Sequence, residues 1–283
     1  MKKKISGIIS IIVILYLIIT GPIANFINNN SITNNASVIN ENHLNTNESK
    51  STNTLVDTKS NKTTETNSKD FYSVSTKFDI KDIPEYNGEA YIYVNNNIPY
   101  FTEDEISTEE FAYFSDLDYL GRCGTCFMNV SSNTLSKEER GDISHIYPTG
   151  WEQEKYDNVD GGWLYNRCHL IANALGGPCG RDGEEEGLLE KDLITGTRYM
   201  NIEGMWQIEE TVKYYIEENP NNHVLYRVTP IFKDNNLLAS GVLMEAYSVE
   251  DNGSGIKLCI YCYNVEPGVE INYQTGESKL IYE

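Results

Sequence analysis

The sequence predicts an α+β fold, and two features of the second half of the chain carry that prediction. Along residues 205–218 the apolar side chains recur at the spacing of one helix face: Ile208, Val212, Tyr215 and Ile216. Three strand-like runs follow, separated by turns rich in Asn, Asp and Gly: 223–232, 237–249 and 256–265. Consecutive strands of this kind pair as an antiparallel meander, so the expected core is an antiparallel sheet flanked by helices.

The first ordered element is predicted to be a β-hairpin. Residues 89–94 and 98–101 have the composition of strands, and three consecutive asparagines at 95–97 stand between them as a turn. Pro99 can donate no ladder hydrogen bond, so the second strand should lie at a sheet edge or begin there.

Between the hairpin and the helix, residues 163–172 are expected to be extended and to carry His169. The Gly- and acid-rich stretch 176–186 is predicted to be a loop. A short strand at 193–195 should then lead into a helix from Thr197 onward.

The N-terminal part of the 283-residue chain has a different composition from the rest. Three lysines followed by an apolar run indicate export, so 1–24 is predicted to be a cleaved signal peptide or a retained membrane anchor. Residues 25–70 are rich in Asn, Ser and Thr and are predicted to be a disordered tether, because they cannot bury enough apolar surface to fold. Residues 71–283 hold most of the tyrosines and all three tryptophans, and are predicted to be one domain.

The charge of the chain is strongly acidic. The formal net charge is −20, and because residues 1–70 are slightly basic, the domain carries about −22. Most proteins that bind nucleic acid show a basic footprint, which this composition does not predict for the whole surface. Any binding to a polyanion is therefore expected to depend on local positive charge in a cleft, and to be weak and salt-sensitive.

Six cysteines occur in a chain with an export signal, which permits disulfides: Cys123, Cys126, Cys168, Cys179, Cys259 and Cys262. Two of their spacings are Cys-x-x-Cys, which allows a structural zinc site, a redox motif, or disulfides and plain buried thiols. No βαβ pattern surrounds the first pair, which disfavours the redox motif. The third interpretation is favoured.

Two segments hold the residue types that phosphodiester cleavage requires: Asn166-Arg167-Cys168-His169, and residues 192–201. A neutral imidazole such as that of His169 can deprotonate water. The carboxamide oxygen of Asn201 can hold a hard metal ion such as Mg²⁺. The guanidinium groups of Arg167 and Arg198 can stabilise phosphate charge.

These segments resemble the DNA/RNA non-specific endonucleases of the ββα-metal (His–metal finger) group, most closely the secreted and surface DNases of Gram-positive bacteria. That family carries an Asp-Arg-Gly-His motif or a variant of it. The resemblance implies a ββα-metal finger nuclease built on a central antiparallel β-sheet flanked by helices, within 71–283. It extends through further segments: Gly121-Arg122-Cys123-Gly124, Pro148-Thr149-Gly150-Trp151, Gly176-Gly177, Tyr226-Arg227-Val228-Thr229-Pro230 and Gly241-Val242-Leu243-Met244-Glu245-Ala246.

By this resemblance His169 is the general base that activates water, and Asn201 is the ligand of Mg²⁺, for which Mn²⁺ can substitute. Glu209 matches a family glutamate that supports the metal-bound waters, with Glu210 as the neighbouring candidate. Asp192 stands where relatives usually have Asn, and an added charge there would tighten metal binding.

Arg167 and Arg198 match contacts to the phosphate and the transition state, although either could be a structural ion-pair partner instead. Asn166 and Cys168 replace the Asp and Gly of the family motif, so orientation of His169 by a carboxylate is not expected here. The resemblance implies an exported endonuclease acting on DNA and RNA, with membrane contact only through the N-terminal segment. The alternative is a catalytically weak or inactive nuclease-like surface binding protein. A cell-wall hydrolase is disfavoured, because neither paired carboxylates nor a closed zinc-ligand set emerges.

Overall fold

A computed structural model describes residues 78–181, 183–185 and 187–281. The predicted signal or anchor (1–24) and the predicted tether (25–70) lie outside these residues. Within the described part of the chain, no helix combines the length and the apolar character needed to cross a membrane.

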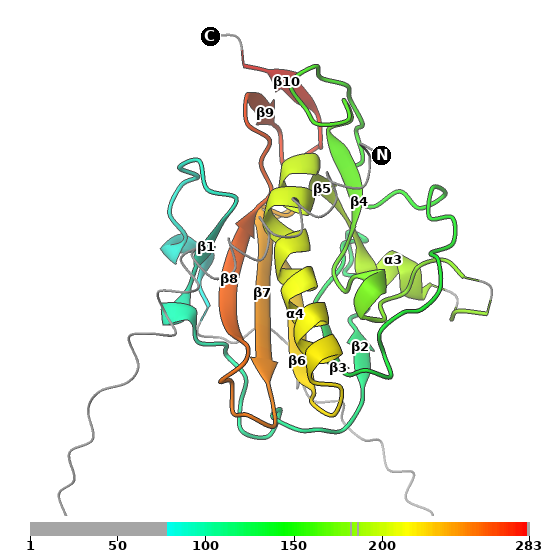
Figure 1. Cartoon of the computed structure of the whole chain (residues 1–283). Helices are drawn as coiled ribbons and strands as arrows, with labels where there is room; N and C mark the ends of the chain where they lie inside the picture. Colours follow the sequence, from blue (N-terminus) through cyan, green and yellow to red (C-terminus); the bar gives the residue numbers. More distant parts are fainter. Residues whose placement is uncertain (1–77, 182, 186, 282–283) are drawn as a thin grey trace, which may run out of the picture. The chain divides into compact units, whose positions relative to one another are not determined.

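The central element is a six-stranded antiparallel sheet with the strand order β1-β8-β7-β6-β3-β2. Its middle is the meander β6-β7-β8, which confirms the three strands that the sequence predicted (Figure 1). The six strands are β1 (Tyr91–Tyr93), β2 (Ala112–Phe114), β3 (Cys126–Val130), β6 (Val224–Ile231), β7 (Gly241–Ser248) and β8 (Lys257–Tyr263).

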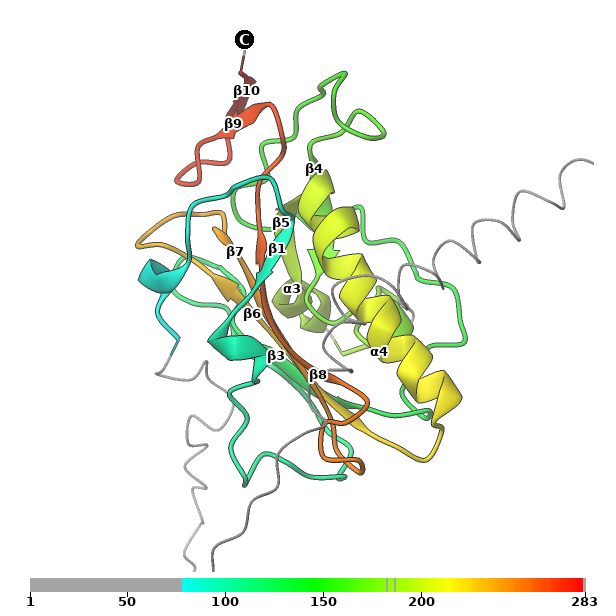
Figure 2. The same cartoon turned by 60° about the vertical axis from the view of Figure 1, so that its left-hand side comes forward.

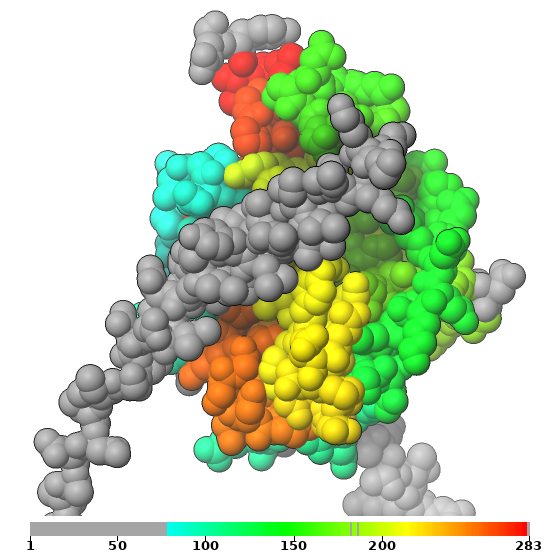
Figure 3. Space-filling view, in the orientation of Figure 1, coloured from blue at the N-terminus to red at the C-terminus, as the bar shows by residue number. Residues whose placement is uncertain are grey.

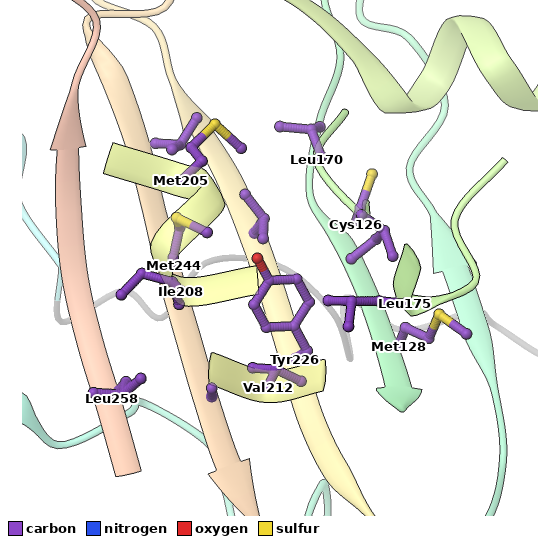
Figure 4. Packing of buried hydrophobic residues seen from close by; sticks show 14 of the residues in the cluster. Cys126, Met128, Leu170, Leu175, Met205, Ile208, Val212, Tyr226, Met244 and Leu258 are labelled. Carbon is purple, nitrogen blue, oxygen red and sulfur yellow. The ribbon is translucent and has the colours of Figure 1, made fainter. Parts of the chain in front are cut away.

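Helix α4 (Trp206–Glu218) packs across one face of this sheet, as Figures 1 and 2 show from two directions. Its buried residues are Ile208, Val212 and Ile216, which the helical spacing predicted. They meet sheet residues such as Tyr226 and Met244 in the main hydrophobic core (Figure 4). Burial of each such aliphatic side chain contributes about 1.5–3 kcal/mol, so this face holds the helix on the sheet.

The opposite face of the sheet buries a charged group. Arg227 is 1% exposed and pairs with Glu245 (Nε–Oε2 2.7 Å) and with Glu105 (Nη1–Oε1 2.7 Å). The guanidinium also lies over the rings of Phe101 (4.6 Å) and Phe127 (5.2 Å). A buried charge is tolerated only when it is paired and hydrogen-bonded, which explains why the segment that carries Phe101 and Glu105 covers this face.

The predicted hairpin is wrong. β1 pairs with β8, and residues 98–101 form no strand. The three asparagines form the short helical turn η2 (Asn95–Asn97) with φ of 49°, 53° and 59°. The Asn97 side chain then accepts from Cys259 N (2.8 Å), which ties the end of β1 to β8. Tyr100 N donates to Glu245 Oε1 (2.7 Å) instead of to a neighbouring strand.

A second, two-stranded sheet stands beside the main one and completes a ββα unit. β4 (Tyr165–His169) pairs antiparallel with β5 (Leu193–Thr197), and the π-helical turn η4 (Met200–Met205) runs directly into α4. The extended segment and the strand that the sequence predicted are confirmed, as is the loop over its described residues 176–181 and 183–185. The predicted fold class is also confirmed. The remaining elements are η1 (Ile80–Asp82), η3 (Asn173–Leu175), α3 (Leu188–Asp192), β9 (Val269–Ile271) and β10 (Ser278–Leu280).

Close packing inside the ββα unit depends on Gly196. A Cβ at this position would lie 2.4 Å from Cys168 Sγ and 2.6 Å from Met200 Cε. The thiol of Cys168, which replaces a glycine of the family motif, therefore fills space that Gly196 leaves empty.

All six cysteines are free and buried, so the disulfide alternative is wrong and the interpretation as plain buried thiols applies. Burial raises the pKa of the Cys168 thiol, which keeps it protonated. Among the described residues, no group of three or more His, Cys, Asp or Glu side chains could hold a metal ion, so the structure offers no Cys₄ zinc site.

Candidate active site

The corner between β5 and the helix is fixed by buried polar side chains. The Asn264 carboxamide, which is fully buried, accepts from Thr197 N (2.8 Å). Glu266 accepts from Tyr199 N (2.9 Å). Because the main chain is held on both sides of Arg198, the start of the helix can present this side chain and, one turn later, Asn201, with little freedom.

The end of β4 is fixed by Asp192. Its main-chain carbonyl accepts from Leu170 N (2.8 Å), and its Oδ1 accepts from Ile171 N (2.8 Å). Asp192 is completely buried, and this burial raises the pKa of its carboxyl well above the usual range. The structure therefore places Asp192 under the segment that follows His169, in surroundings that favour the protonated form of its carboxyl.

His169 lies at the last position of β4. The carbonyl of Pro178 accepts a hydrogen bond from the imidazole, and Nε2 is buried without a partner. Burial, followed by repulsion from Arg140, lowers the pKa of His169 to about 4. At neutral pH the ring is therefore neutral, with a free lone pair on Nε2, which is the form that a general base requires.

The main candidate cavity, of about 600 Å³, opens beside this strand. Its charged lining consists of Arg140, Arg167, Arg198 and Asp142, so it is locally positive although the domain is acidic. His169 itself is not part of the lining. The other lining residues are Gly141, Ile143, Ser144, Trp151, Gln153, Trp163, Tyr165, Asn166 and Asn201.

Arg167 is held by main-chain carbonyls and aromatic rings. Its Nε donates to Ile146 O and its Nη2 to Ser144 O (2.7 Å). The guanidinium lies 4.2 Å from the centroid of the Trp151 ring and 5.3 Å from that of Tyr147. Among the described residues no carboxylate forms a salt bridge with Arg167, although hydrogen bonds from Ser144, together with the charge of Arg167, lower the pKa of Asp142, which lines the same cavity.

Arg198 does have an ion-pair partner. Its Nε and Nη2 both donate to Asp160 Oδ2 (3.1 and 2.8 Å). The Asp160 side chain is 78% exposed, and exposed pairs of this kind contribute at most about 1 kcal/mol. An incoming phosphate can therefore compete with Asp160 for the guanidinium.

Two amide side chains in the lining make no hydrogen bond to the protein. Among the described residues, neither the Asn166 nor the Asn201 carboxamide has a partner. Unpaired polar groups in a cavity are suited to bind a ligand or water. The structure thus brings Asn166, Arg167, Arg198 and Asn201 together around one cavity.

Glu209 and Glu210 differ in their partners. Glu210 pairs with Lys213 (Oε1–Nζ 3.7 Å), whereas no ion pair occupies Glu209 within the described residues. Burial and then the charge of Glu210 raise the pKa of Glu209 to about 8, so its carboxyl is protonated at neutral pH. A partnerless carboxyl of this kind favours Glu209 as the functional candidate, although neither glutamate lines the cavity.

The lining residues that sequence reasoning did not predict include Arg140, Trp151, Gln153 and Trp163. Arg140 stands in a run of charged residues with no motif, Gln153 lies in a segment without periodicity, and Trp163 begins a segment that the sequence predicted only as extended. Only Trp151 carried a signal, since it ends one of the matched segments. The other three residues are assigned to the site because the fold brings them to the cavity, which no spacing in the sequence indicates.

The raised pKa of Asp192 gives a prediction for stability. A group whose folded pKa is raised stabilises fully below its unfolded pKa of about 3.9 and loses that contribution as the pH rises toward the folded pKa. Asp192→Asn keeps an acceptor for Ile171 N and cannot ionise. We expect the unfolding free energy of this variant, relative to wild type, to increase between pH 4 and pH 8 by up to about 1.4 kcal/mol per pH unit. Denaturant unfolding at both pH values measures this, and a relative loss at pH 8 would mean that Asp192 is ionised.

A six-stranded antiparallel sheet with a ββα unit, and an arginine-lined cavity at the start of its helix, define a ββα-metal nuclease fold. A family model described as DNA/RNA non-specific endonuclease matches residues 101–250, which is more than half of the chain. The chain therefore belongs to this family, as its sequence predicted. A deoxyribonuclease from Streptococcus dysgalactiae subsp. equisimilis is 32% identical over 117 residues, which are 40% of this chain and 32% of that protein. The match thus spans about a third of the length of this curated relative.

Solved structures show the same fold. NucA from Streptococcus agalactiae with no metal bound is 21% identical, with a TM-score of 0.58 over 71% of this chain and 92% of NucA. NucA with a magnesium ion bound is 22% identical, with a TM-score of 0.55 over 67% of this chain and 86% of NucA. The Sda1 nuclease with a bound zinc ion is 26% identical, with a TM-score of 0.51 over 61% of this chain and 82% of Sda1.

Proposed function

We propose that the protein is an exported, metal-dependent endonuclease that hydrolyses phosphodiester bonds of DNA and RNA with little sequence preference. The observation that carries the proposal is the cavity in which three arginines and two partnerless asparagine amides meet beside the strand of His169. Membership of the non-specific endonuclease family supports the same reaction class.

His169 is the proposed general base. Its Nε2 has no protein partner and its ring is neutral at neutral pH, so it can take a proton from the water that attacks phosphorus in line. The hydrogen bond to the Pro178 carbonyl fixes the ring in place of the carboxylate of the family motif. Arg167 and Arg198 would bind the non-bridging phosphate oxygens, because guanidinium groups match phosphate geometry.

The donor set at the cavity suits a hard divalent cation. Asn201 offers an amide oxygen, and a site with one protein ligand leaves the ion most of its water, as Mg²⁺ prefers. When bound, such an ion would stabilise the developing negative charge on the phosphate and the leaving 3′ oxygen, giving 5′-phosphate ends. The magnesium in NucA and the zinc in Sda1 support a divalent metal. We propose Mg²⁺, with Mn²⁺ able to substitute, and Glu209 as support for its waters.

Little sequence preference follows from the lining. Its charged and amide groups are suited to bind phosphate and metal rather than the edges of bases. Phosphate groups are the same along every nucleic acid strand, so such contacts carry no sequence information. The acidic body limits long-range attraction, so we expect modest affinity for DNA that falls with salt. Hydrolysis of plasmid DNA and of RNA with Mg²⁺, and after chelation, tests the proposal. Binding without hydrolysis would support the alternative of a nuclease-like surface binding protein.

The proposed location is outside the cytoplasm. The basic residues and apolar run of 1–24 are typical of an export signal, and the composition of 25–70 fits a tether that holds the domain away from a membrane. We propose retention on the membrane rather than release. Sequencing the N-terminus of the mature protein in membrane and medium fractions tests this, and a mature chain in the medium that begins near Asn25 would reject the anchor.

A further inference from the structure

An irregular hairpin delivers aromatic rings to the cavity. Tyr156 N donates to Gly162 O (2.9 Å) and Leu164 N donates to Glu154 O (3.1 Å), and these bonds flank an isolated bridge between Lys155 and Trp163. The hairpin packs through a small core onto the C-terminal hairpin, so that the two adjoin in Figure 3 as bright green beside red. These hydrogen bonds and this packing therefore fix the position of Trp163.

The two tryptophans of the cavity are used differently. The Trp151 ring is occupied by the Arg167 guanidinium at 4.2 Å. Trp163 is 49% exposed, and its only close ring partner among the described residues is Lys155, whose Nζ lies 4.1 Å from the ring centroid. The lysine can contact only one face of the indole ring, so the other face is available for a second contact. Because Trp163 lines the cavity, the exposed part of its ring is open to a ligand there.

Trp163 also lies close along the main chain to a candidate phosphate contact. The carbonyl of the next residue, Leu164, accepts from Arg198 N (2.8 Å). Both Trp163 and Arg198 line the cavity, and this hydrogen bond holds the main-chain segments that carry them side by side. A nucleotide whose phosphate contacts Arg198 would bring its base or the neighbouring base toward the indole.

We propose that Trp163, with Lys155 behind it, is a stacking platform for an unpaired nucleobase, which makes single-stranded nucleic acid the preferred substrate. This inference rests on the proposed function. Every base has a π-face, so stacking on an aromatic side chain tolerates any sequence. A base inside a duplex is already stacked on both sides and must be unstacked before it can use the platform.

Kinetics of Trp163→Ala and Trp163→Phe on a short single-stranded DNA and on its duplex test the proposal. Tyr214→Ala is the matched control, because Tyr214 is also 49% exposed, has the Lys213 Nζ 5.9 Å from its ring and lies outside the cavity. Stacking on an aromatic side chain supports a loss in kcat/KM of about 5- to 150-fold for Trp163→Ala on the single strand. We expect this loss mainly through KM, with a smaller loss on the duplex, partial retention in Trp163→Phe and no effect of Tyr214→Ala.

Binding gives a second readout that does not require catalysis. In the His169→Ala background, a single-stranded oligonucleotide should quench tryptophan fluorescence, and the Trp163-dependent part of that quenching should vanish with an abasic strand. Unchanged kcat/KM in Trp163→Ala, equal losses on single strand and duplex, or equal quenching by the abasic strand would each overturn the inference and leave the proposed function intact. Absence of hydrolysis by the wild type would instead reject the proposed function, while the quenching experiment would still decide on stacking.

Discussion

His169→Ala is expected to lower kcat by about 10²- to 10⁴-fold, because general base catalysis contributes a factor of this size. His169 is the one histidine on a strand beside the arginine-lined cavity, and its Nε2 has no other hydrogen-bond partner. The substitution removes the group that accepts the proton of the attacking water. Binding of nucleic acid should persist, since the cavity lining does not include this side chain.

His223→Ala is the matched control for this experiment. His223 precedes β6, pairs with Glu250 and does not line the cavity, so its loss should leave kcat unchanged. Imidazole added to His169→Ala should restore part of the rate if the lost role is proton removal. Equal rates for His169→Ala and wild type would place the general base elsewhere.

Asn201→Ala is expected to raise the Mg²⁺ concentration needed for half-maximal rate by about 10- to 100-fold or more. Even groups that only support metal ligands contribute a factor of this size, and Asn201 is the proposed protein ligand itself. Its carboxamide lines the cavity and makes no hydrogen bond within the described residues, so the substitution should leave the fold intact. A metal titration of the initial rate measures the shift.

Asn201→Asp separates the loss of a ligand from a change in packing. It keeps an oxygen donor of almost the same size, so its metal requirement should stay close to that of wild type or fall below it. If the alanine variant shows the wild-type metal dependence, Asn201 is not the ligand, and Asn166, the other partnerless amide of the cavity, becomes the candidate.

The elements that the sequence predicted correctly are those with a regular pattern. The stripe of Ile208, Val212 and Ile216 repeats at the helical period and is buried as expected. The meander β6-β7-β8 was predictable because turn-forming residues separate three apolar runs. The segment of His169 was likewise recognised as extended, and the family motif pointed to the residues that meet at the cavity.

The errors arose where long-range contacts decide the structure. Residues 98–101 have strand composition, but Tyr100 N bonds to the buried Glu245 carboxylate that also pairs with Arg227. The sequence around Tyr100 does not indicate that Glu245 is its partner, because Glu245 lies far away in the chain. Arg140 reaches the cavity from a loop and Trp163 from an irregular hairpin, and neither segment has a periodicity that points to the cavity.

Hydrolysis is proposed to depend on a divalent cation bound at the arginine-lined cavity, and removal of metal tests this dependence most directly. Supercoiled plasmid DNA should be nicked and then degraded by the purified wild-type protein in Mg²⁺. The same preparation in excess EDTA should leave the plasmid intact, and added Mg²⁺ should restore cleavage in wild type at a concentration too low for Asn201→Ala. Cleavage at an undiminished rate in EDTA would contradict the account.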